Sequence, residues 1–272
     1  MIGLVLGDTH IGRLIISKLK LLKKNFIVID ISKKKIFKNY KNSFPLSIGQ
    51  LGKAINILKK NKCKKVIFAG RVERPDFYKT KFDFKALYYL PKIIKETKKG
   101  DAYIINLITR IFLKEGLKII RQTSFNKELL LKKGNCTKTK IDISSKKDIN
   151  IAKRIIINPK TNNVGQGVIV SSGITIITET QNGTDFMLRK AKKSLNKQYL
   201  QRSKERKGIL LKFPKHNQDL RTDLPTIGIK TLKLCSSIGL KGIIVKSNQN
   251  IFLDQKKCIK LANKKKMFIT AI

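Results

Sequence analysis

One short stretch, from Asp219 to Gly228, gathers residue types that can do chemistry: two carboxylates, an arginine and a proline. Pro225 fixes its own φ and disfavours helical backbone at the residue before it, so Asp223 is expected on a stiff turn. Carboxylate oxygens can hold a divalent cation and Arg221 can clamp a phosphate, which are the parts of a phosphoryl-transfer site. A structural interpretation is also open, in which the acids pair with Arg221 and cap a helix that begins near Thr226.

The charge of the chain is extreme, with 61 Lys and Arg residues against 17 Asp and Glu residues and a formal net charge of +44. Such a charge can indicate nucleic-acid binding. However, just ten of the basic residues are arginines, and the lysines are spread over every segment without interleaved aromatic residues. We therefore expect no specific nucleic-acid partner, and we keep weak attraction to an anionic membrane surface as the alternative.

The length and the apolar content indicate a globular protein, because 272 residues with 41% hydrophobic residues can build one large or two ordinary domains. The sequence contains no apolar run of spanning length and no secretory leader, so a cytoplasmic location is expected. The four cysteines are far apart, without a C-x-x-C pair. They are expected to be reduced and mostly buried.

The first half begins with a βαβ pattern: an apolar strand at 2–6, a helical pattern at 14–22 and a second strand at 26–30. A turn from Gly7 to Gly12 joins the first strand to the helix, and its backbone N–H groups are candidates for binding a phosphate. The turn is not a full G-x-G-x-x-G fingerprint, so a dinucleotide is weakly indicated.

A third strand is predicted at 65–70 after a helix at 49–60, and it ends in Gly70-Arg71-Val-Glu73-Arg74. Open parallel sheets bind ligands at the carboxyl ends of their strands. Arg71 or Arg74 can bind a substrate phosphate there, or simply pair with a neighbouring acid. Both interpretations are open.

Regular elements continue to the end of the chain and define the domains. Periodicity is lost between residues 121 and 148, so we divide the chain into domains 1–135 and 136–272. The second half contains a predicted hairpin, 165–170 with 174–179, which makes its sheet mixed. The remaining predicted elements are helices at 82–97, 101–115, 149–157, 184–189, 227–237 and 254–264, and strands at 117–120, 208–213, 242–245 and 267–270.

A second group of polar residues follows the hairpin. Thr184 is a candidate N-cap, and Asp185 and Arg189 have the spacing of an ion pair on one helix face. The functional alternative is that Glu179 and Asp185 meet at the junction between strand and helix and face Asp223 across a cleft.

Five motifs in order carry a family resemblance: Gly52-Lys-Ala, Phe68 to Phe77, Gly165-Gln-Gly167, Asn182-Gly-Thr-Asp185 and Asp219 to Gly228. Together the sequence resembles the two-domain UDP-2,3-diacylglucosamine hydrolases of lipid A biosynthesis, the type unrelated to calcineurin-like enzymes. The resemblance covers nearly the whole chain except about 121–163. It implies an α/β fold, with an N-terminal Rossmann-like parallel-sheet domain and a C-terminal α/β domain.

The resemblance also implies an activity: water attacks the α-phosphorus of UDP-2,3-diacylglucosamine, which gives UMP and 2,3-diacylglucosamine 1-phosphate (lipid X). Mg²⁺ dependence, a homodimer and peripheral contact with the cytoplasmic face of the inner membrane are expected with it. A non-catalytic nucleotide-sugar or dinucleotide-binding protein is the competing function. The family's Glu-Gly-Thr-Asp motif reads Asn182-Gly-Thr-Asp185 here, so position 182 is not an indispensable metal ligand.

These considerations assign the site residues. Asp223 is expected to be the catalytic acid, and Asp223, Asp185 and Glu179 are expected to hold the metal. Substrate binding is expected at seven positions: Gly7, Gly70, Arg71, Gln166, Thr184, Arg189 and Arg221. The two acyl chains need an apolar enclosure, for which a cavity between the domains lined by Leu87, Leu90 and Ile94 is a candidate, although these side chains can also be ordinary core.

Overall fold

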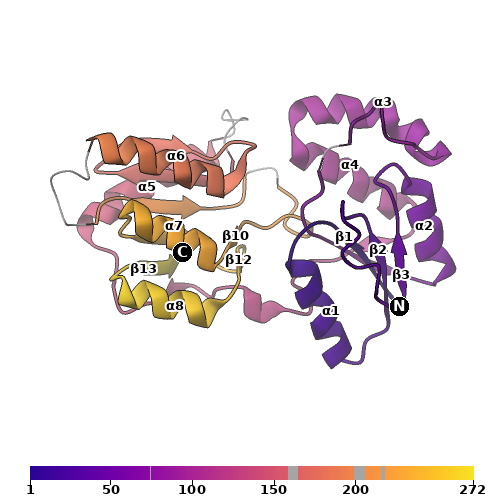
Figure 1. Ribbon diagram of the computed structural model, residues 1–272, viewed down its shortest axis with the longest axis horizontal. Coiled ribbons are helices and arrows are strands. Elements are labelled where there is room, and N and C mark those ends of the chain that lie inside the picture. Colours follow the sequence, from indigo (N-terminus) through magenta and orange to yellow (C-terminus); the bar gives the residue numbers. More distant parts are fainter. Residues whose placement is uncertain (74, 159–164, 199–205, 216–217) are drawn as a thin grey trace. The chain divides into compact units, whose positions relative to one another are not determined.

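A computed structural model describes residues 1–73, 75–158, 165–198, 206–215 and 218–272. The chain packs as two compact units. The first unit contains residues 1–127 together with 219–223, and the second contains 128–218 and 224–272. Both are built from helices and a central sheet (Figure 1), which confirms the predicted α/β fold class.

The first unit is a five-stranded parallel sheet with the strand order β3-β2-β1-β4-β5. This is the order of a Rossmann-like half, so the N-terminal prediction is confirmed. β3 was not predicted, because it has three residues in a polar stretch and ends in a proline. The strands are β1 (Ile2–Leu6), β2 (Phe26–Asp30), β3 (Ser43–Pro45), β4 (Lys65–Ala69) and β5 (Lys118–Ile119), and the helices are α1 (Ile11–Leu21), α2 (Leu51–Lys60), α3 (Phe84–Lys99) and α4 (Asp101–Lys114).

Both faces of this sheet are covered, which explains why its strands are continuous apolar runs. Val5 and Phe68 pack on one face with residues of α2 and α4, including Ile55 and Phe112. The alternate residue Leu6 lies on the α1 side, where a Cβ atom added to Gly12 would meet its side chain at 3.2 Å.

The second unit has a six-stranded mixed sheet with the order β6-β13-β11-β9-β7-β8. β9, β11 and β13 are parallel, whereas β6, β7 and β8 run antiparallel to their neighbours. The predicted hairpin and the mixed sheet are therefore confirmed. The strands are β6 (Gly134–Asn135), β7 (Gly167–Ser171), β8 (Ile174–Thr178), β9 (Ile209–Lys212), β11 (Gly242–Val245) and β13 (Phe268–Ala271).

Helices cover the two faces of the second sheet unequally. α5 packs on one face through Ile149 and Ala152, and three helices pack on the other through residues such as Leu188, Leu232 and Cys258. A two-stranded parallel sheet, β10 (Thr226–Ile227) with β12 (Ile251–Phe252), stands apart from it. The helices are α5 (Ile143–Ile157), α6 (Gly183–Gln198), α7 (Ile229–Ile238), α8 (Gln255–Lys264) and a 3₁₀ turn at Lys127–Leu129.

Two predicted helix starts were wrong. α5 begins earlier than expected because Asp142 caps it and accepts the N–H of Ser145 at 2.7 Å. Thr226 does not open a helix, since it lies in β10, and α7 begins at Ile229.

The four cysteines are free thiols, three of them buried, as predicted. Burial raises the pKa of Cys258 to about 11, so its thiol stays protonated and unreactive at neutral pH. Within the described parts of the chain, every helix is too short or too polar to cross a bilayer.

Candidate functional site

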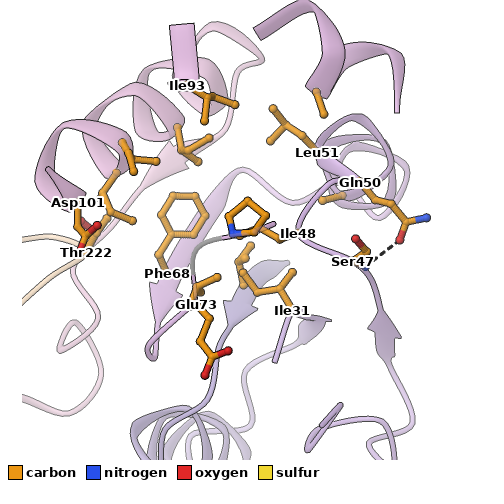
Figure 2. Close-up of a pocket in the computed structure, with 18 of the residues that line it drawn as sticks. Ile31, Ser47, Ile48, Gln50, Leu51, Phe68, Glu73, Ile93, Asp101 and Thr222 are labelled. Atoms are coloured by element: carbon orange, nitrogen blue, oxygen red, sulfur yellow. Dashed lines mark hydrogen bonds between the residues drawn. The ribbon is translucent and has the colours of Figure 1, made fainter. Parts of the chain in front are cut away.

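An apolar pocket of about 230 Å³ lies in the first unit, at the carboxyl edge of its parallel sheet (Figure 2). Residues at the carboxyl ends of β1 and β4, among them Val5, Ala69 and Gly70, line it. The strand order reverses between these two strands, and such a switch point is where open α/β sheets bind their ligands. The fold therefore places the pocket where a ligand site is expected.

The walls of the pocket are mainly aromatic and branched side chains. Phe68 projects into it beside Ile48, Ile31 and residues of α3 and α4 (Figure 2). Polar residues are a minority of the lining: Ser47, Gln50, Glu73, Thr97, Asp101 and Thr222. Such a lining suits a hydrocarbon chain better than a nucleotide.

The residues of α3 that face this pocket are not those expected. Leu87 and Ile94 are 49% and 40% exposed, and neither they nor Leu90 line the pocket. Ala86 and Ile93 line it instead. Each of these two residues comes one position before an expected one, Ala86 before Leu87 and Ile93 before Ile94. One position is a rotation of about 100° around the helix, so the two pairs lie on different sides of α3.

The acidic turn belongs to the first unit in packing, although it lies far along the chain. The carbonyl oxygen of Asp219 accepts the N–H groups of Thr222 at 3.1 Å and Asp223 at 3.0 Å. Its carboxylate accepts Nε of Arg221 at 3.0 Å and Nη2 at 2.8 Å. Burial alone would raise the pKa of Asp219, but the hydrogen bonds from Arg221 hold it below its ordinary value. The predicted pairing with Arg221 is therefore confirmed for Asp219, whereas the predicted capping of a helix near Thr226 is wrong.

A glutamine that sequence reasoning missed holds this turn. The backbone N–H of Gln122 donates to the carbonyl of Arg221 at 2.9 Å, and its Nε2 donates to the carbonyl of Thr222 at 3.4 Å. The Gln122 side chain is buried. No pattern in the sequence indicates this contact, because Gln122 follows a two-residue strand in a stretch without periodicity.

Asp223 itself is exposed at the end of the fixed turn. The residue before it, Thr222, lines the apolar pocket, and the two residues after it, Leu224 and Pro225, are buried. A carboxylate on a well-anchored backbone next to a lipid-like pocket is suited to a reaction at the polar head of an amphiphile. The catalytic role of Asp223 remains a prediction.

The glycine loops after β1 and β4 are packed against each other. Gly7 N–H donates to Ala69 O at 2.9 Å and Asp8 N–H donates to Arg71 O at 2.7 Å. Gly70 has φ of +98°, and a Cβ atom on it would lie 2.8 Å from the carbonyl oxygen of Gly7. The amide of Gly7 is thus used inside the protein, and the idea that it donates to a phosphate has no support. Substrate binding by Gly7 and Gly70 stays a prediction.

Among the described residues, Arg71 forms none of the ion pairs with a neighbouring acid that one alternative proposed. Glu73 contacts Lys33 at 3.2 Å and Asp76 contacts Lys79 at 3.9 Å. Arg71 is exposed and remains a candidate for binding phosphate. Arg74 lies outside the described residues.

The end of β2 argues against the dinucleotide alternative. In dinucleotide-binding folds an acid near this position receives the ribose hydroxyls. Here Asp30 is fully buried, and its carboxylate accepts the N–H of Ser32, the hydroxyl of Ser32 and the N–H of Phe37. The Asp30 carboxylate therefore holds a local turn and is not accessible to a ribose.

A buried polar chain lies at the start of α6 in the second unit. Lys212 Nζ donates to Thr184 Oγ1 at 2.5 Å, and Thr184 Oγ1 donates to Glu179 Oε2 at 3.0 Å. All three residues are at most 9% exposed. A Cβ atom on Gly167 would lie 2.6 Å from Glu179 Oε2, so the glycine leaves room for the carboxylate. Sequence reasoning missed Lys212, which is the last residue of an apolar strand.

The local interpretation of the residues around Thr184 was wrong. Thr184 is the second residue of α6 and its hydroxyl is directed to Glu179. Asp185 pairs with Lys230 of α7 at 2.5 Å and not with Arg189, which is exposed. Gln166 accepts the N–H of Phe213 through its carbonyl at 2.9 Å. The substrate-binding roles of Thr184, Arg189, Gln166 and Arg221 remain predictions.

Among the described residues, no three side chains of His, Cys, Asp or Glu gather to hold a metal ion. Glu179 and Asp185 are each engaged, by Thr184 and Lys230 respectively. Their predicted roles as metal ligands would require an exchange of partners on metal binding.

In the comparison with known proteins, two domain models of the same family match nearly the whole chain. Residues 1–129 match the LpxI N-terminal domain and residues 132–270 match the LpxI C-terminal domain. The chain is also 32% identical over 227 residues to the UDP-2,3-diacylglucosamine pyrophosphatase LpxI of Caulobacter vibrioides, covering 84% of this chain and 81% of that protein. The acidic turn lies within the stretch matched by the C-terminal model, yet it packs with the first unit. The chain belongs to the LpxI family.

Proposed function

We propose that this protein hydrolyses the pyrophosphate bond of UDP-2,3-diacylglucosamine in lipid A biosynthesis and releases UMP and 2,3-diacylglucosamine 1-phosphate. One observation carries the proposal in the structure: the anchored turn of Asp219–Asp223 places Thr222 in the wall of an apolar pocket and Asp223 directly after it. The reaction needs both features, since the substrate joins a diphosphate to two acyl chains. The named relative from Caulobacter supports the same substrate.

The reaction is slow without help because the diphosphate repels a nucleophile. We assign to Asp223 the orientation of the attacking water at the α-phosphorus and the acceptance of its proton. The backbone bonds from Gln122 hold the turn that carries Asp223, and fixed geometry of this kind lowers the barrier. Arg71, Arg189 and Arg221 are the proposed contacts to phosphate oxygens.

Magnesium dependence is part of the proposal. Mg²⁺ takes one or two protein carboxylates together with substrate phosphates and water, so a cluster of three protein ligands is not required. The exposed carboxylate of Asp223 suits this role, and Asp185 and Glu179 are the further candidates. When bound, the ion would neutralise charge on the phosphate oxygens.

The apolar pocket is the proposed site for acyl-chain carbons. Phe68, Ile93 and Phe112 and their neighbours offer a continuous hydrocarbon surface, whose contact with a chain contributes roughly 25 cal/mol per Å² removed from water. We also propose a homodimer in the cytoplasm that touches the inner membrane peripherally, since its substrate is a lipid.

The direct test is release of UMP from UDP-2,3-diacylglucosamine in detergent micelles with Mg²⁺. Asp223→Asn should stay folded and lose at least about a hundredfold in kcat, the scale of an essential acid–base group. Glu96→Gln, which removes a half-buried carboxylate that pairs with Lys99 on α3, is the matched control and should keep the normal rate. In water enriched in the heavy oxygen isotope, the label should enter UMP.

The outcomes separate the possible errors. A normal rate for Asp223→Asn would remove that residue from the mechanism. Tight binding of the nucleotide without any UMP from the unmodified chain would favour the non-catalytic alternative. Label in the sugar phosphate would place the attack on the other phosphorus.

A further inference from the structure

The outer face of α3 exposes an apolar stripe, which consists of Phe84, Leu87, Tyr88 and Ile94. Their exposed fractions are 93%, 49%, 74% and 40%. The spacing of three, four and seven residues places them along one side of the helix. Tyr78, just before the helix, is exposed as well. Scattered apolar residues on a surface are ordinary, but a contiguous stripe with two aromatic rings indicates a binding surface.

Lysines border this stripe. Lys92, Lys95 and Lys98 of α3 are exposed, as are Lys79 and Lys81 before it. The single acidic residue of α3 is Glu96, which contacts Lys99 at 2.9 Å. The face is therefore apolar at its centre and cationic at its margin.

The opposite face of the same helix lines the apolar pocket. Ile93 projects into the pocket from α3 (Figure 2), and Ala86 and Thr97 line it as well. Figure 1 shows α3 as an outer helix of the first unit. One helix thus separates a lipid-like cavity from an exposed apolar surface.

We propose that the outer stripe of α3 docks on a bilayer surface that contains anionic lipids. Helices with Phe and Leu on one side and lysines beside them lie in the interface plane, where their apolar side chains leave water and their cations meet lipid head groups. The docked helix brings the pocket next to the acyl chains of the bilayer. This reason for docking rests on the proposed lipid substrate, whereas the docking itself is measured without it.

Charge selects the bilayer over a second copy of the chain. A two-fold interface brings the same patch of both subunits together, so the lysines around the stripe would oppose one another. Like charges across an interface are unfavourable, whereas an anionic membrane surface is complementary to them.

The test is co-sedimentation of the full chain with vesicles of phosphatidylcholine alone or mixed with phosphatidylglycerol. The chain should bind the anionic vesicles more tightly. The triple variant Phe84→Ser, Leu87→Ser and Tyr88→Ser should lower the partition coefficient at least about tenfold, and Lys92→Glu with Lys95→Glu should lower it on anionic vesicles alone. The matched control is Leu21→Ser with Ile143→Ser, which removes side chains that are each 76% exposed elsewhere and should leave binding unchanged.

Two further measurements keep this proposal separate from the catalytic one. UMP release in detergent micelles should be the same for the triple variant and the unmodified chain, which also shows that the variant is folded. Vesicle binding that is unaffected by the triple variant, or equal on neutral and anionic vesicles, would overturn the docking surface. A change in oligomeric mass of the triple variant in sedimentation equilibrium would assign the stripe to contact between copies and overturn it too. Vesicle binding without any UMP release would leave the docking surface intact and reject the proposed function.

Discussion

The acidic turn of the first unit and the buried polar chain of the second unit hold carboxylates in opposite ways. In the turn, Asp219 is paired with Arg221 and the backbone is tied down by Gln122, while Asp223 is exposed. In the polar chain, Glu179 is buried with Thr184 and Lys212. The first arrangement fixes a backbone and leaves a carboxylate accessible to a substrate, whereas the second places the acid itself inside the protein. The comparison predicts that the buried chain contributes more to stability than the acidic turn does, and that the acidic turn contributes more to catalysis.

The largest effect on stability is expected for Lys212→Met. The change removes the cation from the hydrogen-bonded chain that contains Glu179 and leaves a carboxylate buried without it. Loss of one partner of a buried charge typically costs about 3 kcal/mol or more. The midpoint of urea unfolding measures this loss.

Lys230→Met is the matched control, because Lys230 pairs with Asp185 on the surface. It should cost at most about 1 kcal/mol. Adding Glu179→Gln to Lys212→Met should restore part of the stability, since the buried charge is then gone. Equal losses of stability for Lys212→Met and Lys230→Met would show that the buried chain stabilises the fold no more than the surface ion pair does.

Gln122→Ala should act mainly on catalysis. The variant keeps the backbone bond to Arg221 but loses the side-chain bond to Thr222, so the turn carrying Asp223 gains freedom. We expect kcat to fall about tenfold with little change in KM, because positioning is lost rather than binding. The free energy of unfolding should fall by about 1 kcal/mol.

The control for Gln122 is Gln255→Ala. Gln255 also donates its side-chain amide to a backbone carbonyl, that of Glu128, at 2.7 Å, in the second unit. Its loss should leave kcat unchanged. If both variants lower kcat equally, the effect is general loosening of the protein and Gln122 has no positioning role.

The sequence predicted most of the fold because the strands and helices are periodic and bounded by clear turns. Elements that depend on distant pairing escaped prediction: β3 and β10 are too short to show a pattern and exist because β2 and β12 lie beside them. The residues of the candidate site also fall into those that a local pattern predicts and those that depend on distant contacts. Proline and the paired acids marked the turn at Asp219–Asp223, but Gln122 and Lys212 contribute through contacts with residues far along the chain. No local pattern encodes such contacts.

The smallest effect is expected from the pH dependence of the Asp219–Arg221 pair. The pKa of Asp219 is lowered in the folded protein, so the pair stabilises the fold above the unfolded-state pKa and loses this contribution as pH falls through the folded-state pKa.

The substitution Asp219→Asn removes this stabilising contribution of the ion pair. The difference in unfolding free energy between the two proteins should be largest near neutral pH and should shrink in acid. Its size should be about 1 kcal/mol or less, because Arg221 is 40% exposed and water screens the pair. Urea unfolding at several pH values measures this difference. If the difference in unfolding free energy stays constant from neutral to acid pH, the charge of Asp219 does not stabilise the fold. Asp219 would then hold the acidic turn through its shape and its hydrogen bonds, and the contrast with the buried Glu179 would not be one of charge.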